Sequence, residues 1–355
     1  MMDGNIKVNT YPEQHYSTVF NKSTGLFIRV EENGCKEPFW AKSGPELIDI
    51  SITNYCERNC KFCYRNSNKS GRHIQLQDYI NVINQAANIG TLQVALGGGN
   101  PNQHPDFVQM LKETAAIGIV PSYTTNGEGL SKEVLKATQQ HCGAMAVSAY
   151  SPYESYLSEI IEYISSFEIK TNIHFLLNKE SVEKAISWMK NPPPFLKKIN
   201  AIIFLNYKPI FSNHDILLVK SPLLQDFFEC VENNKTHLKI GFDSCSISGI
   251  VKYMKINKIF YESCEASRFS AFISEDLKMY PCSFMIDTNS FGDLKYNSII
   301  EIWKENKYFI KHRNNILNND CKTCFLEPEC MGGCTFMSEI NLCNPTCKTD
   351  KITEP

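Results

Sequence analysis

The sequence lacks the features that direct a chain to a membrane or to nucleic acid. No run of apolar residues approaches the roughly 18 that cross a bilayer. Its 36 Lys and Arg residues nearly balance 38 Asp and Glu residues, so a net charge of −2 gives no broad attraction to polyanions. The opening residues, MMDGNIKVNT, contain no apolar stretch, so we expect no secretory signal there. We therefore expect a cytoplasmic protein that binds neither membranes nor nucleic acid.

Internal repeats and low-complexity tracts are also absent. The chain has 355 residues, of which 43% are hydrophobic, and this is enough to bury a substantial core. The sequence therefore predicts a globular protein of two domains, or one large domain with an appendage.

Cysteine, in contrast, is abundant, with 15 residues. Disulfides are rare in reducing cytosol, so a cysteine-rich chain without an export signal indicates metal or cluster binding. Three of the cysteines lie together in residues 56–63, which we call the three-cysteine motif. Eight more cysteines lie between residues 264 and 347, and only a few cysteines lie in the long stretch between the two groups. This distribution predicts two cluster-binding regions with an ordinary globular stretch between them.

Between residues 46 and 243, strand-like and helix-like stretches alternate. Short segments rich in Val, Ile, Thr and aromatic residues predict strands over 47–53, 92–97, 120–125, 144–150, 170–177 and 201–207. Amphipathic stretches between them predict helices over 78–89, 106–118, 132–141 and 181–190. This alternation favours a parallel α/β architecture, whose chemistry lies at the carboxyl ends of the strands.

The regions on either side differ from this pattern. Residues 1–45 contain two alternating segments, YSTVF and GLFIRVEE, that predict a β-hairpin. After about residue 243 we expect short strands and turns that bury little apolar surface and are held together by metal–thiolate bonds. The expected domains are therefore 1–45, 46–243 and 244–355.

The three-cysteine motif follows the first predicted strand of the α/β region. Cys56, Cys60 and Cys63 have the spacing Cys-x3-Cys-x2-Cys. Three thiolates on one loop can hold three irons of a four-iron cluster and leave the fourth iron open to an exogenous ligand. A zinc site is the alternative, but it normally takes a fourth protein ligand, and no neighbouring residue is Cys or His.

This motif, with Phe62 before its third cysteine, resembles the signature of radical S-adenosylmethionine (SAM) enzymes. The resemblance implies a partial (β/α)6 TIM-like barrel in which a 4Fe-4S cluster binds SAM at its open iron. In that family the reduced cluster cleaves SAM to methionine and a 5′-deoxyadenosyl radical, which takes a hydrogen atom from the substrate. An electron donor such as flavodoxin or ferredoxin is implied as a partner.

The same resemblance implies a set of SAM-contacting residues at the predicted strand ends. The glycines of residues 97–99 resemble the Gly-Gly-Glu stretch of the family, with Asn100 in place of Glu. The implied contacts are Phe62, Gly97, Gly98, Gly99, Asn100, Asn126, Ser148 and Asn172. A turn-forming or core role remains the alternative for each polar residue, and we expect a structural role for His174.

The carboxy-terminal cysteines include CKTCFLEPECMGGC, with the spacing Cys-x2-Cys-x5-Cys-x3-Cys. A zinc ribbon is one interpretation, because it also uses paired Cys-x2-Cys knuckles. The spacing resembles the SPASM domain, which carries two auxiliary 4Fe-4S clusters, although EDL (275–277) replaces the family's hairpin glycine. The resemblance implies three clusters in all, with Cys347 favoured over Cys343 as the last ligand. The candidate auxiliary ligands are Cys245, Cys264, Cys282, Cys321, Cys324, Cys330, Cys334, Cys343 and Cys347.

Enzymes with a SPASM domain mostly modify ribosomally made peptides or proteins, so the resemblance implies crosslinking, epimerisation or related C–H activation. Sulfatase-maturing members place Asp after the cysteine that closes the hairpin, whereas Ser283 stands here. A serine hydroxyl is a weak base, which disfavours that activity. Radical chemistry on a small metabolite or nucleotide, and a non-catalytic metal scaffold that binds partners, are the alternatives.

Overall fold

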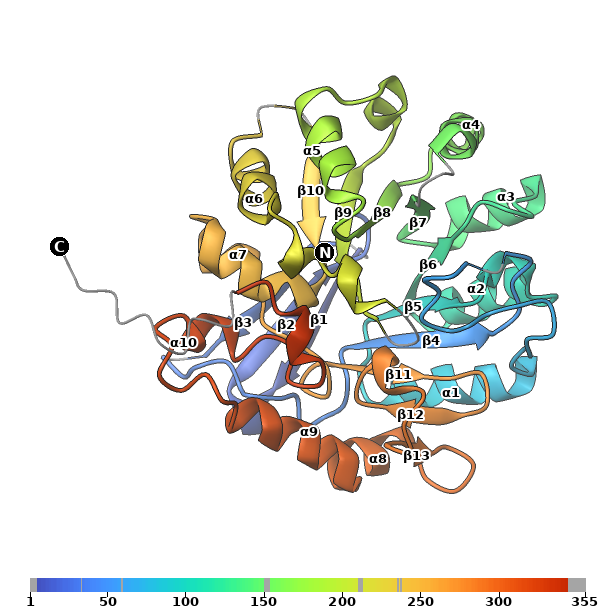
Figure 1. The fold of residues 1–355 in the computed structure, drawn as a ribbon. Coiled ribbons are helices and arrows are strands. Elements are labelled where there is room, and N and C mark those ends of the chain that lie inside the picture. The colour runs from blue at the N-terminus through green and yellow to red at the C-terminus, as the bar shows by residue number, and fades with distance from the viewer. Residues whose placement is uncertain are drawn as a thin grey trace. The chain divides into compact units, whose positions relative to one another are not determined.

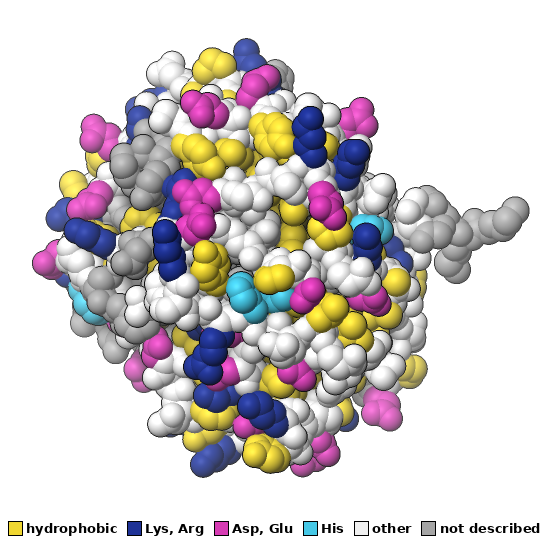
Figure 2. Space-filling model, turned by 90° about the vertical axis from the view of Figure 1, so that its right-hand side faces the viewer, with side chains coloured by type: hydrophobic (Ala, Val, Ile, Leu, Met, Phe, Trp, Pro, Cys, Tyr) yellow, Lys and Arg dark blue, Asp and Glu magenta, His cyan; other side chains and the backbone are white. Residues whose placement is uncertain are grey.

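The computed structural model describes residues 5–32, 34–58, 60–149, 154–209, 213–234, 236 and 238–343. The chain forms two compact units. The first comprises residues 1–146, 166–170 and 266–310, and the second comprises 147–165, 171–265 and 311–355. Among the described residues, no helix is long and apolar enough to cross a membrane. Lys/Arg and Asp/Glu side chains are interspersed on the face drawn in Figure 2.

The first unit begins the α/β alternation that the sequence predicts. Its parallel strands β4, β5 and β6 are each followed by a helix (Figure 1). The bounds are β4 Leu47–Thr53, α1 Leu76–Asn88, β5 Gln93–Gly98, α2 Phe107–Ala116, β6 Val120–Thr125 and α3 Lys132–His141. Strand β7, Ala144–Ala149, continues the chain into the second unit.

The second unit continues the alternation with β8, β9 and β10, of which β9 pairs in parallel with both others. Its elements are α4 Glu154–Ile164, β8 Thr171–Leu177, α5 Val182–Lys190, β9 Ala201–Asn206, α6 Leu224–Glu232, β10 Lys239–Phe242, α7 Ile247–Tyr253 and α10 Glu327–Cys330. The six predicted strands are confirmed, each to within one residue. Strand β10 has only four residues and was not predicted.

Strand β4 shows why these segments form buried strands. Ile48, Ile50 and Ile52 are fully buried on one face, and each such side chain contributes about 1.5–3 kcal/mol of transfer free energy. The alternate residues Asp49, Ser51 and Thr53 lie on the other face because the side-chain period of a strand is two. Strand β4 therefore presents a polar face that ends beside the three-cysteine motif.

The amino-terminal region is a three-stranded antiparallel sheet in the order β1–β2–β3. Its strands are β1 Ile6–Tyr11, β2 Tyr16–Asn21 and β3 Phe27–Glu31. The predicted hairpin corresponds to β2 and β3 and is confirmed, whereas β1 was not predicted. Tyr16 and Phe20 are fully buried, and the Tyr16 hydroxyl donates to Glu46 at 3.1 Å. This sheet thereby packs against the segment that leads into β4.

A second antiparallel hairpin in the first unit surrounds residues 275–277, where the SPASM resemblance implies a hairpin turn. It comprises β11 Ser270–Ile273 and β12 Lys278–Tyr280, and β12 also pairs with β13 Gly292–Asp293. Strand β11 pairs in parallel with β4, with Ile273 opposite Ile50 (Figure 1). Leu277 in its turn has a φ of +66°, a left-handed conformation that favours glycine. The substituted glycine position thus keeps the backbone shape that glycine would adopt.

Two helices follow the hairpin, α8 Ile299–Glu305 and α9 Lys307–Leu317. Trp303 is fully buried, and its indole N–H donates to the carbonyl oxygen of Ala41 at 2.6 Å. Phe309 is also fully buried and packs against Trp303. The prediction of only short strands and turns after residue 243 was therefore wrong, because this part of the chain buries large aromatic side chains.

Candidate active site and cluster ligands

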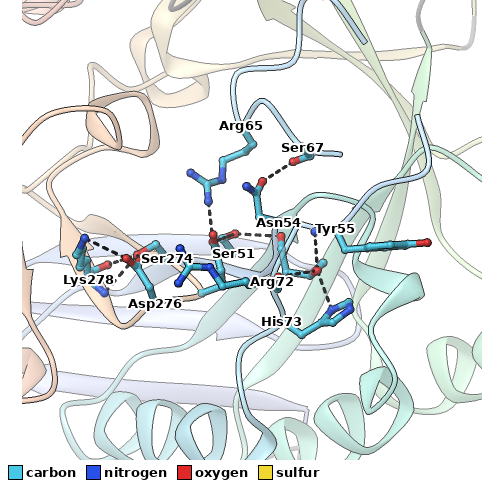
Figure 3. Close-up of polar contacts among 12 residues, drawn as sticks. Ser51, Asn54, Tyr55, Arg65, Ser67, Arg72, His73, Ser274, Asp276 and Lys278 are labelled. Carbon is cyan, nitrogen blue, oxygen red and sulfur yellow. Dashed lines mark hydrogen bonds and ion pairs between the residues drawn. The ribbon is translucent and has the colours of Figure 1, made fainter. Parts of the chain in front are cut away.

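The three cysteines lie on the connection between β4 and α1, residues 54–75, which we call the three-cysteine loop. This loop folds back on itself, because the Cys56 N–H donates to Asn68 O at 3.1 Å and Ser67 Oγ donates to Asn54 Oδ1 at 2.7 Å (Figure 3). Gly71 has no room for a Cβ, which would lie 1.9 Å from the carbonyl oxygen of Asn54. The start of the loop is therefore fixed directly at the end of β4.

The three thiols are close enough to influence one another. Cys56 is buried, and Cys60 and Cys63 are partly buried. The pKa of the Cys60 thiol is raised to about 11, mainly by burial and in smaller part by the neighbouring thiols of Cys63 and Cys56. In the described part of the chain, no three Cys, His, Asp or Glu side chains converge tightly enough to hold one metal ion. A four-iron cluster takes one thiolate per iron, so these three thiols can hold three irons of one cluster.

The loop after β6 reaches the three-cysteine loop. Asn126 Nδ2 donates to Cys56 Sγ at 3.5 Å, and the Arg58 guanidinium pairs with Glu128 at 2.7 Å. Hydrogen bonds to cluster sulfurs influence the reduction potential of such clusters. Asn126 was predicted as a SAM contact, and the structure places it beside the first cysteine. No pattern in the sequence pointed to Glu128.

The glycines at the end of β5 serve two purposes. Gly98 has a φ of +107°, and a Cβ there would lie 2.1 Å from Thr53 O and 2.3 Å from Ser51 Oγ. A Cβ at Gly99 would lie 2.0 Å from Tyr55 O, so both glycines are required by close packing against the end of β4. A Cβ at Gly97 would meet nothing within 4 Å. Gly97 therefore borders open space that a ligand can approach.

The predicted SAM contact Asn100 is buried, and its side chain bonds within the protein. Its Nδ2 donates to Glu128 O at 2.9 Å, and its Oδ1 accepts from Thr125 Oγ1 at 2.9 Å. Asn102 makes an equivalent pair of hydrogen bonds to Glu128 O and from Thr125 Oγ1. The two amides thus brace the loop after β6, a role that the sequence did not reveal.

The remaining predicted SAM contacts are Phe62, Ser148 and Asn172. Phe62 is partly buried on the three-cysteine loop. Ser148 on β7 and Asn172 on β8 belong to the second unit, where Asn172 Oδ1 accepts from Asn200 Nδ2 at 2.9 Å. Burial lowers the pKa of His174, also on β8, to about 4, so this imidazole is neutral at physiological pH.

Two groups of carboxy-terminal thiols gather in the second unit. Burial raises the pKa of Cys330 to about 12, and the neighbouring thiols of Cys343, Cys321 and Cys324 contribute to that value. Cys347, which the sequence analysis favoured as the last ligand, lies outside the described residues. Cys343, the other candidate for that role, lies close enough to Cys330 to raise the pKa of its thiol.

The second thiol group contains Cys245, Cys264 and Cys334. Burial raises the pKa of Cys245 well above its usual value, the Lys208 ammonium opposes this, and Asp243, Cys334 and Cys264 add to it. These three thiols therefore lie close together. Cys282, another candidate auxiliary ligand, lies in the first unit just after β12 and packs against a small apolar cluster of Phe272, Tyr280 and Met285.

Comparison with known families identifies two domains. The model of the Radical SAM superfamily matches residues 50–189, and the SPASM model, an iron-sulfur cluster-binding domain, matches residues 264–325. These matches lie within the ranges that the sequence predicts for a barrel and for a cluster-binding extension. The first includes all three cysteines of the three-cysteine loop.

Among curated proteins, a PqqA peptide cyclase from Bradyrhizobium diazoefficiens is 28% identical over 93 residues, 26% of this chain and 24% of the relative. The chain thus spans about a quarter of the PqqA peptide cyclases that it matches. A GTP 3′,8-cyclase from Vibrio parahaemolyticus is 24% identical over 256 residues, 63% of this chain and 75% of the relative.

Solved structures show the fold more completely. Streptococcus suis SuiB bound to S-adenosylmethionine superimposes with a TM-score of 0.74 at 16% identity, covering 98% of this chain and 99% of SuiB. The structure of anSMEcpe with bound AdoMet and a peptide gives 0.60 at 16% identity, covering 81% and 88%. The predicted fold class, a partial TIM-like barrel with an appended cysteine-rich domain, is confirmed.

Proposed function

Because this chain belongs to the radical SAM superfamily and carries a SPASM domain, we propose that it cleaves S-adenosylmethionine reductively and modifies a ribosomally made peptide. The observation that carries the proposal is the set of three neighbouring thiols at the end of β4, within a matched radical SAM domain. The modification is a crosslink, an epimerisation or a related C–H activation.

The residues of the first unit fit the binding of a cluster and of SAM. Cys56, Cys60 and Cys63 would hold three irons of a cluster, and that cluster, when bound, would supply the electron for SAM cleavage. Gly97 leaves the end of β5 open to a ligand. Asn126 donates a hydrogen bond to Cys56 Sγ and so stabilises negative charge on that sulfur. Flavodoxin or ferredoxin is the electron donor that we expect.

Two auxiliary clusters complete the proposed cofactor set, for a total of three. We assign Cys321, Cys324, Cys330 and Cys343 to one, supported by the proximity of their thiols. We assign Cys245, Cys264 and Cys334 to the other, supported by the proximity of their thiols, and the resemblance to the SPASM domain implies Cys282 as its fourth ligand. Both sites are then fully ligated by protein, so direct binding of substrate to an auxiliary iron is not expected.

The similarity to SuiB over nearly the whole chain supports a peptide substrate, since SuiB was solved bound to its precursor peptide SuiA. The local match to PqqA peptide cyclases points in the same direction. A nucleotide substrate is the second candidate, because the GTP 3′,8-cyclase match extends over 63% of this chain.

The first experiment tests SAM cleavage. Anaerobically reconstituted protein, mixed with SAM and dithionite, should release 5′-deoxyadenosine. Cys60→Ala should abolish this release while the auxiliary iron stays bound, because only the cluster of the three-cysteine loop loses a ligand. Normal 5′-deoxyadenosine release by the variant would refute the assignment.

A second experiment tests the cluster count and ligands. Three clusters of four irons predict about twelve irons per chain, and Cys343→Ala should lose about four of them. Cys347→Ala is the matched control and should keep the full complement. About four irons with stoichiometric zinc would instead identify the carboxy-terminal domain as a zinc module.

A third experiment separates the substrate classes. Peptides encoded by short reading frames beside this gene, GTP, and a sulfatase-type peptide are each incubated with the active enzyme. A mass change in the first peptides alone supports the proposal. Conversion of GTP would support the nucleotide alternative, and formylglycine formation would overturn the inference drawn from Ser283.

A further inference from the structure

The turn between β11 and β12 reaches the end of β4. Strand β11 runs parallel to β4, and its last residue, Ile273, lies opposite Ile50. The next residues of the hairpin therefore come level with Ser51, at the carboxyl end of β4. This register places Glu275, the second residue of the turn, beside the polar face of β4.

The Glu275 carboxylate joins two separate parts of the candidate site. Its Oε2 accepts a hydrogen bond from Ser51 Oγ at 2.8 Å and pairs with Arg65 Nη2 at 2.6 Å. Only 12% of the Glu275 side chain and 5% of the Arg65 side chain are exposed. Figure 3 shows Arg65 extending from the three-cysteine loop toward Ser51. Charge-assisted hydrogen bonds of this length in a buried setting are strong and geometrically selective.

Arg65 is positioned to transmit this contact to the cluster ligands. It follows Cys63 by two residues, in a tight turn in which the Asn66 N–H donates to Cys63 O at 3.1 Å. Its Nε has no hydrogen-bond partner among the residues described. The pKa of Asp287 is raised by burial and lowered by Arg65, but within the described ranges no hydrogen bond or ion pair joins these two side chains. Glu275 is therefore the principal partner of the guanidinium.

The neighbouring contacts hold the same two segments together. The Arg65 guanidinium lies 5.8 Å from the ring centroid of Phe272 on β11. The Tyr64 and Phe284 rings, on the three-cysteine loop and just after β12, lie 5.0 Å apart. On the β4 side, Ser51 lies against Gly98, where a Cβ would approach its Oγ to 2.3 Å. Glu275 thus contacts both elements that border the proposed SAM site.

We propose that Glu275 is a positioning residue that holds the three-cysteine loop through Arg65 and the end of β4 through Ser51, and so sets how the cluster of this loop presents SAM. This inference rests on the proposed function. It assigns to the SPASM region a role in the SAM site that is separate from holding auxiliary clusters.

The test compares four variants of the full-length, reconstituted protein. Glu275→Gln and Arg65→Gln each remove one charge, and the double variant removes both. Asp276→Asn is the matched control. Asp276 lies in the same turn but pairs with Lys278 at 3.0 Å and with the Ser274 hydroxyl, both within the hairpin (Figure 3). Iron content, the EPR spectrum of the reduced protein with and without SAM, and the KM and kcat for 5′-deoxyadenosine release are measured.

Each single variant should lower kcat/KM for SAM about 10- to 100-fold, mainly through a higher KM, since replacing residues that orient metal ligands typically costs that much in metal affinity or activity. Each should also reduce the spectral change that SAM produces, with the auxiliary iron retained. The Asp276→Asn protein should match the parent. Equal behaviour of Glu275→Gln and Asp276→Asn would overturn the proposal.

The double variant keeps the test decisive if a single variant fails to fold. The double variant leaves no unpaired buried charge. If the ion pair had only a structural role, this variant should therefore recover the parental KM and spectrum. A positioning role predicts that SAM binding stays weak and that the loss does not exceed that of the worse single variant. A parent protein that takes up iron but releases no 5′-deoxyadenosine would refute the proposed function. The spectra of the reduced variants without SAM would still decide whether Glu275 shapes the loop.

Discussion

Asp49 provides the sharpest test of the electrostatics inside the first unit. It lies on β4 with Ser51 and Thr53, opposite Ala95 of β5 and Phe272 of β11. Protein surrounds its carboxyl group although part of the residue's surface is accessible, and burial raises its pKa from 3.8 to about 6. The perturbation is Asp49→Asn, which keeps the shape of the side chain and removes its charge.

The size and sign of the effect follow from this pKa. Each tenfold change in the acid equilibrium is worth about 1.36 kcal/mol, so charged Asp49 costs the folded state about 3 kcal/mol. Below about pH 4 the Asp49 carboxyl is protonated in both the folded and the unfolded state, so the free energy of unfolding carries no penalty from a buried charge. Between pH 4 and the folded pKa of about 6, the carboxyl ionises in the unfolded state before it ionises in the folded state, so the free energy of unfolding falls as the pH rises. Above the folded pKa, the full penalty of the buried charge is present. Asp49→Asn should therefore be more stable than the parent by about 3 kcal/mol at pH 8 and by about half of that at pH 5.

The assay is urea unfolding under anaerobic conditions, followed by circular dichroism from pH 5 to pH 8. Asp276→Asn is the control of opposite sign: although burial acts against it, the Ser274 hydroxyl and Lys278 lower the pKa of Asp276. That variant should lose stability, by a nearly constant amount over this range. A difference between Asp49→Asn and the parent that does not grow with pH would refute the reasoning.

Substitutions at three local features provide further tests. Leu277→Gly should raise the free energy of unfolding by up to about 1 kcal/mol, because a left-handed conformation costs a residue with a Cβ about 1–2 kcal/mol. A lower free energy of unfolding in urea would show that the contacts of the leucine side chain outweigh this cost. Ser298→Ala removes the capping box of α8 and should cost about 1 kcal/mol, whereas Glu301→Gln should cost less, and equal losses would argue against the box. Trp303→Ala should cost about 3–5 kcal/mol, visible as a lower melting temperature, and an unchanged melt would contradict the burial of this indole.

The parallel strands and their helices were predictable because buried strands and amphipathic helices leave strong local patterns. Strand β10 and helices α8 and α9 were not predicted. The four residues of β10 are too few to show a period, and they pair only because β9 is adjacent. Helix α8 is stabilised by the Ser298 cap and by the hydrogen bond from Trp303 to Ala41, which lies more than 250 residues earlier in the chain. Such long-range partners leave no periodic signal in the sequence.

In the candidate site, too, features with a local sequence pattern were predictable, and features that depend on long-range contacts were not. The spacing of the three cysteines is local, so the sequence identified them and their place after a strand. The role of Glu275 was not predictable, because its position beside Ser51 depends on the β11–β4 register. Asn100 was interpreted as a SAM contact through its backbone or an amide. The hydrogen bonds of its side chain to Glu128 and Thr125 were not predictable, because the sequence does not reveal the loop after β6 as its neighbour.

The pairing of β4 with β11 also determines when the barrel can be completed during synthesis. At about 5–20 residues per second, the roughly 220 residues between these strands emerge over about 10 to 45 s. During that interval β4 is an unpaired edge that can join wrong partners, and Arg65 is a cation without its carboxylate. A chain that ends before residue 270 retains the open edge, so the isolated barrel should aggregate rather than act as a smaller enzyme.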